Sequence, residues 1–115
     1  IEDFKMTLYK REFGESFNLG FDHSEFPWLV DKSWHNDVCP SFTFKAGSQY
    51  LVLWVDYEEP EKREYEQERY VVMTATNEGT DTEPEIYAGE GSEVVMATES
   101  PSEFTAYLRQ LDSAH

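Results

Sequence analysis

The stretch Gln49–Tyr57 constrains the fold more than any other part of the chain. Side chains alternate in direction along a strand, so Tyr50 and Trp54 would point to one face, and Leu51 and Val55 to the other. The β-branched and aromatic residues of the stretch favour a pleated, buried surface. Because both faces are apolar, we expect a central strand that is covered on both sides.

Further strands are expected on both sides of this stretch along the chain. Short alternating or β-branched runs predict them at Ser16–Phe21, Ser41–Lys45, Arg69–Thr76, Glu85–Gly89 and Glu93–Thr98. We expect the central strand and Arg69–Thr76 to pair antiparallel across the charged connection between them. The predicted fold class is α+β, with an antiparallel sheet of about five strands, which is a usual size.

The C-terminal segment carries a clear signal for the start of a helix. Ser100 and Glu103 have the spacing of a capping box, with proline at the first helical position. Phe104 and Leu108 then recur at helical spacing and give the helix one apolar face. The sequence therefore predicts a helix over residues 101–112 that packs on one face of the sheet.

The N-terminal segment Asp3–Phe13 fits either a helix or one strand of a hairpin. Acidic residues at its start, Lys10 and Arg11 near its end and Gly14 just beyond it favour the helix. Alternating apolar residues in the same segment favour the strand. We expect the helix.

Residues 22–40 show no sustained period, and we expect them to form a loop over the sheet. A loop of this length is uncommon in a compact domain and is often functional. Its large apolar side chains should anchor it, namely Phe26, Trp28, Leu29 and Trp34.

Three side chains of this loop offer chemistry, because an extended backbone would place His35, Asp37 and Cys39 on one side. An imidazole, a carboxylate and a thiol together could bind a transition metal, or His35 could activate the Cys39 thiol. The alternative is a capped turn anchored by Trp34, with a small, buried Cys39. The spacing matches no established metal motif, so we predict no metal and no cofactor.

Acidic residues outnumber basic ones by 24 to 9, which gives a formal net charge of −15. Nucleic-acid binding needs a basic patch, so this charge argues against direct contact with nucleic acid and favours a basic partner. The densest acidic run is Glu58–Arg69, which would be either an acidic docking edge or a solvated connection. The predicted binding residues are Trp34, His35, Asp37, Glu58, Glu59, Glu61 and Glu64.

Asp56, at the end of the central strand, is a separate candidate for an acid or a base. A carboxylate between aromatic residues could have a raised pKa. The alternative is a structural ion pair with Lys62, Arg63 or Arg69, since such pairs also perturb carboxylates.

Length and cysteine content bound the remaining properties. The chain of 115 residues is expected to form one domain, 1–115. No apolar run approaches the ~18 residues of a membrane span, so we expect no membrane contact. The single cysteine, Cys39, allows no intrachain disulfide, and we expect a cytoplasmic location. The oligomeric state stays open.

These features predict a small acidic interaction protein without catalysis. It would bind a basic protein partner as an inhibitor, an immunity-type protein or a mimic of nucleic acid. One alternative is an enzyme or metal site that uses His35, Asp37 and Cys39 in a loop-covered pocket. The other is a small-ligand binding module with an aromatic pocket.

Overall fold

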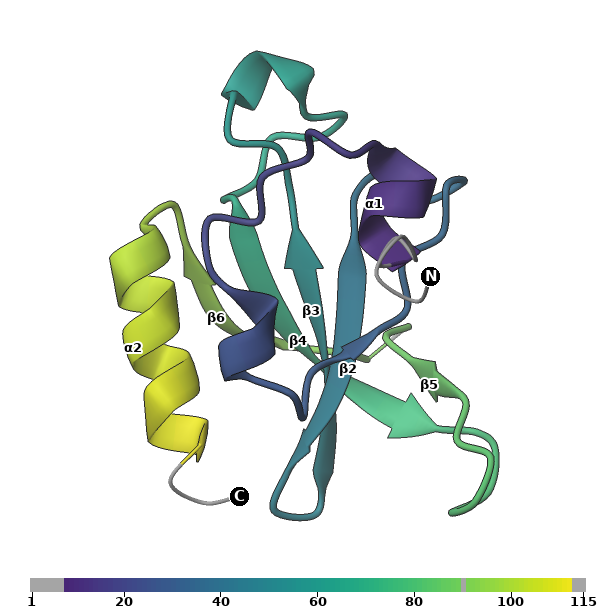
Figure 1. The fold of residues 1–115 in the computed structure, drawn as a ribbon. Coiled ribbons are helices and arrows are strands. Elements are labelled where there is room, and N and C mark those ends of the chain that lie inside the picture. Colours follow the sequence, from purple (N-terminus) through teal and green to yellow (C-terminus); the bar gives the residue numbers. More distant parts are fainter. Residues whose placement is uncertain (1–7, 90, 113–115) are drawn as a thin grey trace, which may run out of the picture.

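The predicted strand over residues 49–57 lies at the centre of an antiparallel sheet as β3 (Gln49–Val55). The computed structural model describes residues 8–89 and 91–112, and its α+β architecture confirms the predicted fold class (Figure 1). The other elements, with η for a 3-10 helix, are α1 (Leu8–Phe13), η2 (His23–Glu25), β1 (Val30–Asp31), β2 (Ser41–Ala46), η3 (Pro60–Lys62), β4 (Tyr70–Asn77), β5 (Ile86–Tyr87), β6 (Val94–Thr98) and α2 (Pro101–Asp112).

In the sheet, β1, β2, β3 and β4 follow one another as antiparallel neighbours. The predicted pairing of the two central strands is confirmed, with Tyr50 opposite Ala75 and Val55 opposite Tyr70. Strand β6 pairs with the first part of β4, and β5 pairs with its last two residues. The last two predicted strands therefore both pair with β4 and not with each other.

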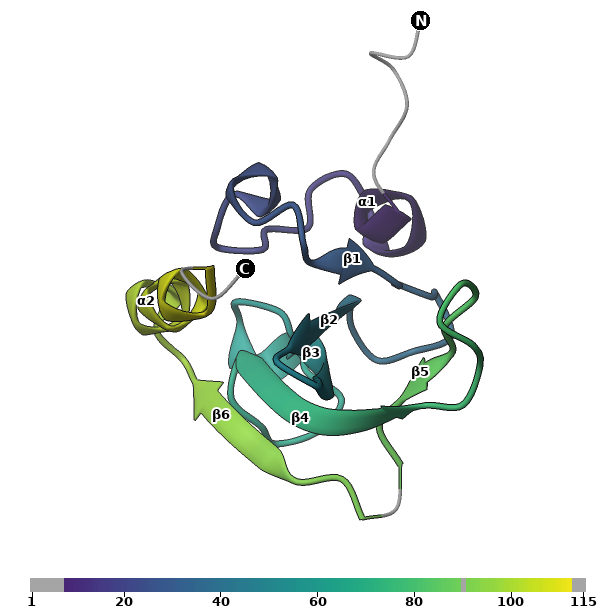
Figure 2. The ribbon, with the colours of Figure 1, turned by 90° about the horizontal axis from the view of Figure 1, so that it is seen from below.

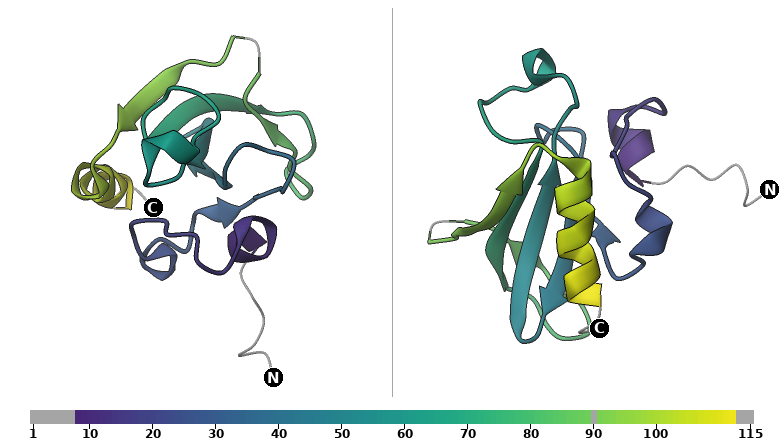
Figure 3. Two further views of the ribbon diagram at one scale, coloured as in Figure 1. Left: turned by 90° about the horizontal axis from the view of Figure 1, so that it is seen from above. Right: turned by 90° about the vertical axis from the view of Figure 1, so that its left-hand side faces the viewer.

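One face of the sheet is covered by α2 and by the segment that contains α1 and η2, as Figures 2 and 3 show. Leu53 and Val55 of β3 are fully buried on this covered face, in one core cluster with Phe104 of α2. The ring of Tyr70 stacks on that of Phe104, with the centroids 4.4 Å apart and the planes 6° apart. Burial of each such side chain contributes roughly 1.5–3 kcal/mol, so this core is the main source of stability.

Helix α2 spans the residues predicted for it, because its start is fixed locally. Ser100 Oγ accepts a hydrogen bond from the Glu103 N–H at 3.2 Å, as in a capping box. The Glu103 carboxylate accepts a hydrogen bond from Thr98 Oγ1 at 3.2 Å, and Thr98 Oγ1 accepts one from the Ser100 N–H at 3.1 Å. A hydroxyl of β6 thus completes the cap and ties the helix to the sheet.

The strand predicted over residues 16–21 is wrong, because this segment is irregular. Its alternation reflects burial alone, with Leu19 in the core. Side chains of β4 and of the residue before it take the place of a neighbouring strand. The Tyr70 hydroxyl donates to the Leu19 carbonyl at 2.6 Å, and the Arg69 guanidinium donates to the Asn18 carbonyl at 2.9 Å. The buried backbone is satisfied without a strand ladder.

The helix favoured for the N-terminal segment is present as α1, which ends at Phe13 with Gly14 just beyond it, as expected. Gly14 has a φ of 109° and donates its N–H to the Lys10 carbonyl at 2.8 Å, which is a common way for a helix to end. The predicted start of this helix lies outside the described residues.

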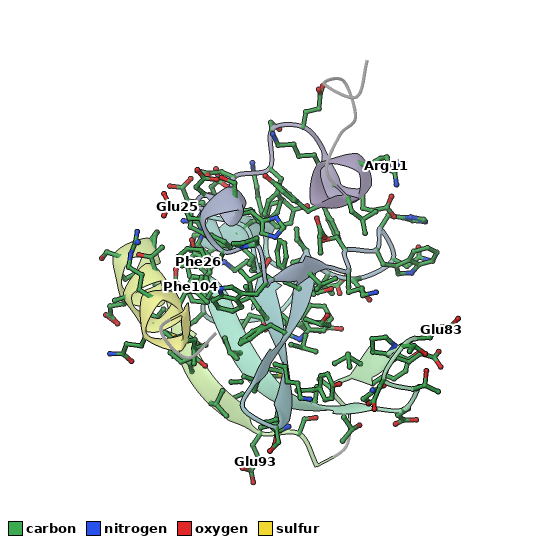
Figure 4. All side chains as sticks on the ribbon, turned by 60° about the horizontal axis from the view of Figure 1, so that its bottom comes forward. Arg11, Glu25, Phe26, Glu83, Glu93 and Phe104 are labelled. Carbon is green, nitrogen blue, oxygen red and sulfur yellow. The ribbon has the colours of Figure 1, made fainter. Side chains whose placement is uncertain are left out.

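The predicted loop over residues 22–40 is divided by η2 and β1. Phe26 is buried as predicted and points, like Phe104, into the space between η2 and α2 (Figure 4). The Arg109–Glu25 ion pair, at 3.1 Å, joins the same two elements. Trp34 is 51% exposed, so its prediction as an anchor is wrong.

None of the helices in the described part of the chain is long and apolar enough to pass through a bilayer.

Candidate binding surface

The second face of the sheet carries no α-helix in the described part of the chain (Figure 2). Strand register places one row of side chains straight across it, made up of Val30, Thr43, Val52, Met73 and Val94. A second row beside it consists of Ser41, Trp54, Val71 and Ala97. These two rows define the open face, which is apolar apart from two small hydroxyl-bearing residues.

Coverage of the open face is incomplete. Val52 is buried, whereas Trp54 and Met73 beside it are half-buried. Val30 and Val94, at the two ends of the first row, are 48% and 55% exposed. The prediction that both faces of the central strand are covered therefore holds fully for one face only.

A groove of about 420 Å³ separates the open face from β5. Thr43, Val52 and Trp54 form its sheet side, and β5 with the residues next to it forms the opposite side. Lys32 and Asp37 also line this groove. Cavities of this size lie within the range that holds small ligands, and they can equally receive a large side chain.

A second groove, of about 390 Å³, lies between the open face and the acidic connection that leads to β4. It is lined by Asn36, Asp37, Val38, Trp54, Glu64, Tyr65, Gln67, Val71 and Met73. Asp37 and Trp54 line both grooves, so the grooves adjoin at this pair. Each groove also has an exposed ring at its border, Tyr87 at 55% exposure in the first and Tyr65 at 62% in the second.

Two acidic segments lie at the two ends of β4 (Figure 1), and each contributes part of its length to the lining of one groove. All their carboxylate residues are exposed, and these are Glu58, Glu59, Glu61, Glu64, Glu66 and Glu68 before β4, and Glu78, Asp81, Glu83 and Glu85 after it. Figure 4 shows Glu83 far from α2. Glu64 and Glu85 line the grooves directly, so negative charge borders the apolar floor.

The bases of the first acidic segment are already engaged. The Arg63 side chain is only 4% exposed and forms two hydrogen bonds with Glu99, at 2.6 and 3.0 Å. It also donates to three carbonyls of residues 57–67, which fixes the course of this connection. Lys62 lies 3.8 Å from Glu59. The hydrogen bond from Arg63 lowers the pKa of Glu99 below its ordinary value.

Asp37 is the acidic residue at the junction of the two grooves. It lies at the end of a turn in which the Asp37 N–H donates a hydrogen bond to the Trp34 carbonyl at 2.9 Å. Burial raises the pKa of its carboxyl group. Within the described residues no ion pair and no side-chain hydrogen bond engages this carboxylate. A partly desolvated carboxylate without a partner is ready to accept a cation.

The structure does not gather His35, Asp37 and Cys39 into one reactive site. The His35 side chain is 58% exposed, with Nδ1 3.0 Å from Glu12 Oε1 and its ring 4.6 Å from that of Trp34. Cys39 is fully buried, and burial together with nearby carboxylates raises the pKa of its thiol, whereas a nucleophilic cysteine needs a lowered pKa. Across residues 8–89 and 91–112, no three His, Cys, Asp or Glu side chains could hold a metal ion.

Asp56 has a structural place at the end of β3, where it is 1% exposed. Its carboxylate accepts hydrogen bonds from the Tyr57 N–H at 2.8 Å and from Gln67 Nε2 at 2.7 Å. Its backbone N–H donates to the Arg69 carbonyl at 2.7 Å. No ion pair of the described residues joins Asp56 to Lys62, Arg63 or Arg69, so the predicted ion pair is absent there.

Sequence reasoning missed Met73, Tyr65 and Tyr87 as lining residues. Alternation within Arg69–Thr76 could have placed Met73 on the same side as Trp54, but only after the register of the two strands was known. Tyr65 lies in the charged connection and Tyr87 in a short predicted strand, and nothing in the sequence indicates which face either ring borders.

No known protein family, no curated protein and no solved structure matches this chain. A function for the open face is therefore inferred from the side chains of this protein alone.

Proposed function

We propose that this protein is a non-catalytic interaction protein that binds a basic protein segment across its open face. One observation carries the proposal: an apolar floor centred on Trp54 lies between two exposed acidic segments. Neither feature alone would select a partner. Together they fit a chain that presents cationic residues at its margins and apolar contact at its centre.

The two features have separate physical roles in such binding. Acidic borders attract a cationic partner over a distance and raise its association rate, and this effect weakens with salt. Apolar contact with Trp54 and the exposed rings of Tyr65 and Tyr87 would supply short-range affinity, since tyrosine and tryptophan are enriched among the residues that dominate interfaces. Measurements at several salt concentrations therefore separate the electrostatic contribution to the association rate from the affinity that apolar contact supplies.

The test uses a fluorescent peptide of mixed lysine and arginine, with fluorescence anisotropy as the readout at several salt concentrations. The double substitution Glu64→Gln/Glu85→Gln removes two charges at the grooves. Glu15→Gln/Glu25→Gln removes two exposed charges on the covered side of the molecule, one of them from the exposed Glu25–Arg109 ion pair, and is the control matched in net charge. Loss of the groove pair should weaken binding about three- to tenfold, as expected for two exposed charge interactions.

The control pair should change the affinity by less than twofold, roughly the effect of screened, distant charge. Equal weakening by both pairs would show that net charge, rather than the open face, attracts the peptide. Affinity that does not fall as salt is raised would remove the electrostatic premise altogether.

A further inference from the structure

We infer that the Asp37–Trp54 junction is a subsite for an arginine side chain of the basic partner. This inference rests on the proposed function and assigns the residue type that enters the grooves. The junction is the one place where both grooves meet, and it combines a carboxylate with an aromatic surface. Those are the two groups that a guanidinium contacts most favourably.

The charges that line the grooves favour a cation at this point. Asp37, Glu64 and Glu85 contribute carboxylates, and Lys32 contributes a single ammonium group. Neither Asp37 nor Lys32 takes part in an ion pair of the described residues, so no base among them neutralises the Asp37 carboxylate. A guanidinium at the junction would supply the missing partner.

The shape of the junction favours arginine over lysine. A guanidinium is planar, so it can lie against the Trp54 indole while its edge donates to the Asp37 carboxylate. An ammonium is a strongly hydrated point charge that would lose more hydration on entering a half-buried groove. Trp54 is half-buried, and no ring or cation contact of the described residues occupies its indole.

The experiment compares an oligoarginine and an oligolysine peptide of equal length on the wild-type chain and on two variants. Asp37→Asn keeps the shape of the side chain and removes its charge. Glu15→Gln removes the same charge from an exposed site away from the grooves. Oligoarginine should bind the wild type about fivefold more tightly than oligolysine, and Asp37→Asn should abolish that preference. Glu15→Gln should preserve it.

A spectroscopic readout locates the contact independently of affinity. The chain has three tryptophans, and the indole N–H signal of Trp54 is identified in an NMR spectrum by its loss in Trp54→Phe. Oligoarginine should shift this signal more than oligolysine does at equal occupancy. Asp37→Asn should fold at least as stably as the wild type, because burial disfavours its charged form.

The outcomes separate this inference from the proposed function. The arginine subsite is refuted if the wild type binds oligoarginine and oligolysine equally well. It is also refuted if Asp37→Asn changes the affinity for each peptide by the same factor as Glu15→Gln does. In both cases binding across the open face stands. If neither peptide binds the wild type, both proposals fall. An unchanged Trp54 signal at saturating oligoarginine would also refute the subsite.

Discussion

Gly20 allows the irregular N-terminal segment to pack against β4, and Gly20→Ala should cost about 2–5 kcal/mol of unfolding free energy. Gly20 has a φ of 84°, a conformation that costs a residue with a side chain about 1–2 kcal/mol. A Cβ at this position would also overlap the Tyr70 hydroxyl. That hydroxyl is buried and donates to the Leu19 carbonyl, so its displacement leaves two polar groups unsatisfied, at about 1–3 kcal/mol.

Gly47→Ala is the matched control, because Gly47 has a φ of 62° and nothing lies within 4 Å of a Cβ built there. It should cost only the conformational part, about 1–2 kcal/mol. Urea unfolding followed by far-UV circular dichroism gives both values. The packing argument would be refuted if the two substitutions destabilised the protein equally.

A double-mutant cycle isolates the contact itself. Tyr70→Phe removes the hydroxyl with which the new methyl group would collide, so Gly20→Ala should cost less in that background than in the wild type. The coupling should be about 1–3 kcal/mol, which is well above the few tenths expected for independent sites. Additive effects of the two substitutions would place the cost of Gly20→Ala in the backbone alone.

Three further predictions follow from single contacts. Ser100→Ala should destabilise the protein by about 1 kcal/mol in urea unfolding, because the Glu103 N–H loses its cap; no change would mean that Thr98 alone holds the helix start. The Cys39 thiol should react with Ellman's reagent only after urea unfolding, since it is fully buried with a raised pKa; rapid reaction of the folded protein would reopen the hypothesis of an activated thiol. Arg63 lowers the pKa of Glu99, so this pair stabilises the protein above the ordinary pKa of 4.5 and loses that contribution as the pH falls through the lowered value. Glu99→Gln should therefore reduce the loss of stability between neutral and acidic pH, and an unchanged pH profile would contradict this linkage.

Local patterns in the sequence determined those elements whose hydrogen bonds and burial are decided within a few residues. The capping box and apolar spacing gave α2 its boundaries, and Gly14 gave α1 its end. The β-branched run of β3 and its antiparallel pairing with β4 were predictable because both strands are strongly apolar and adjacent along the chain.

Only the tertiary structure decided which alternating segments are strands and which side chains meet. The segment around Phe17 alternates like a strand, but its backbone groups find side-chain partners rather than a neighbouring strand. The junction of Asp37 and Trp54 depends on how a turn 17 residues earlier in the chain lies against the sheet. Alternation is a property of a few consecutive residues, whereas register and loop placement depend on contacts between distant ones. The sequence could therefore predict the sheet and the excess of acidic residues. It could not predict which face of the sheet brings an apolar surface and these carboxylates together.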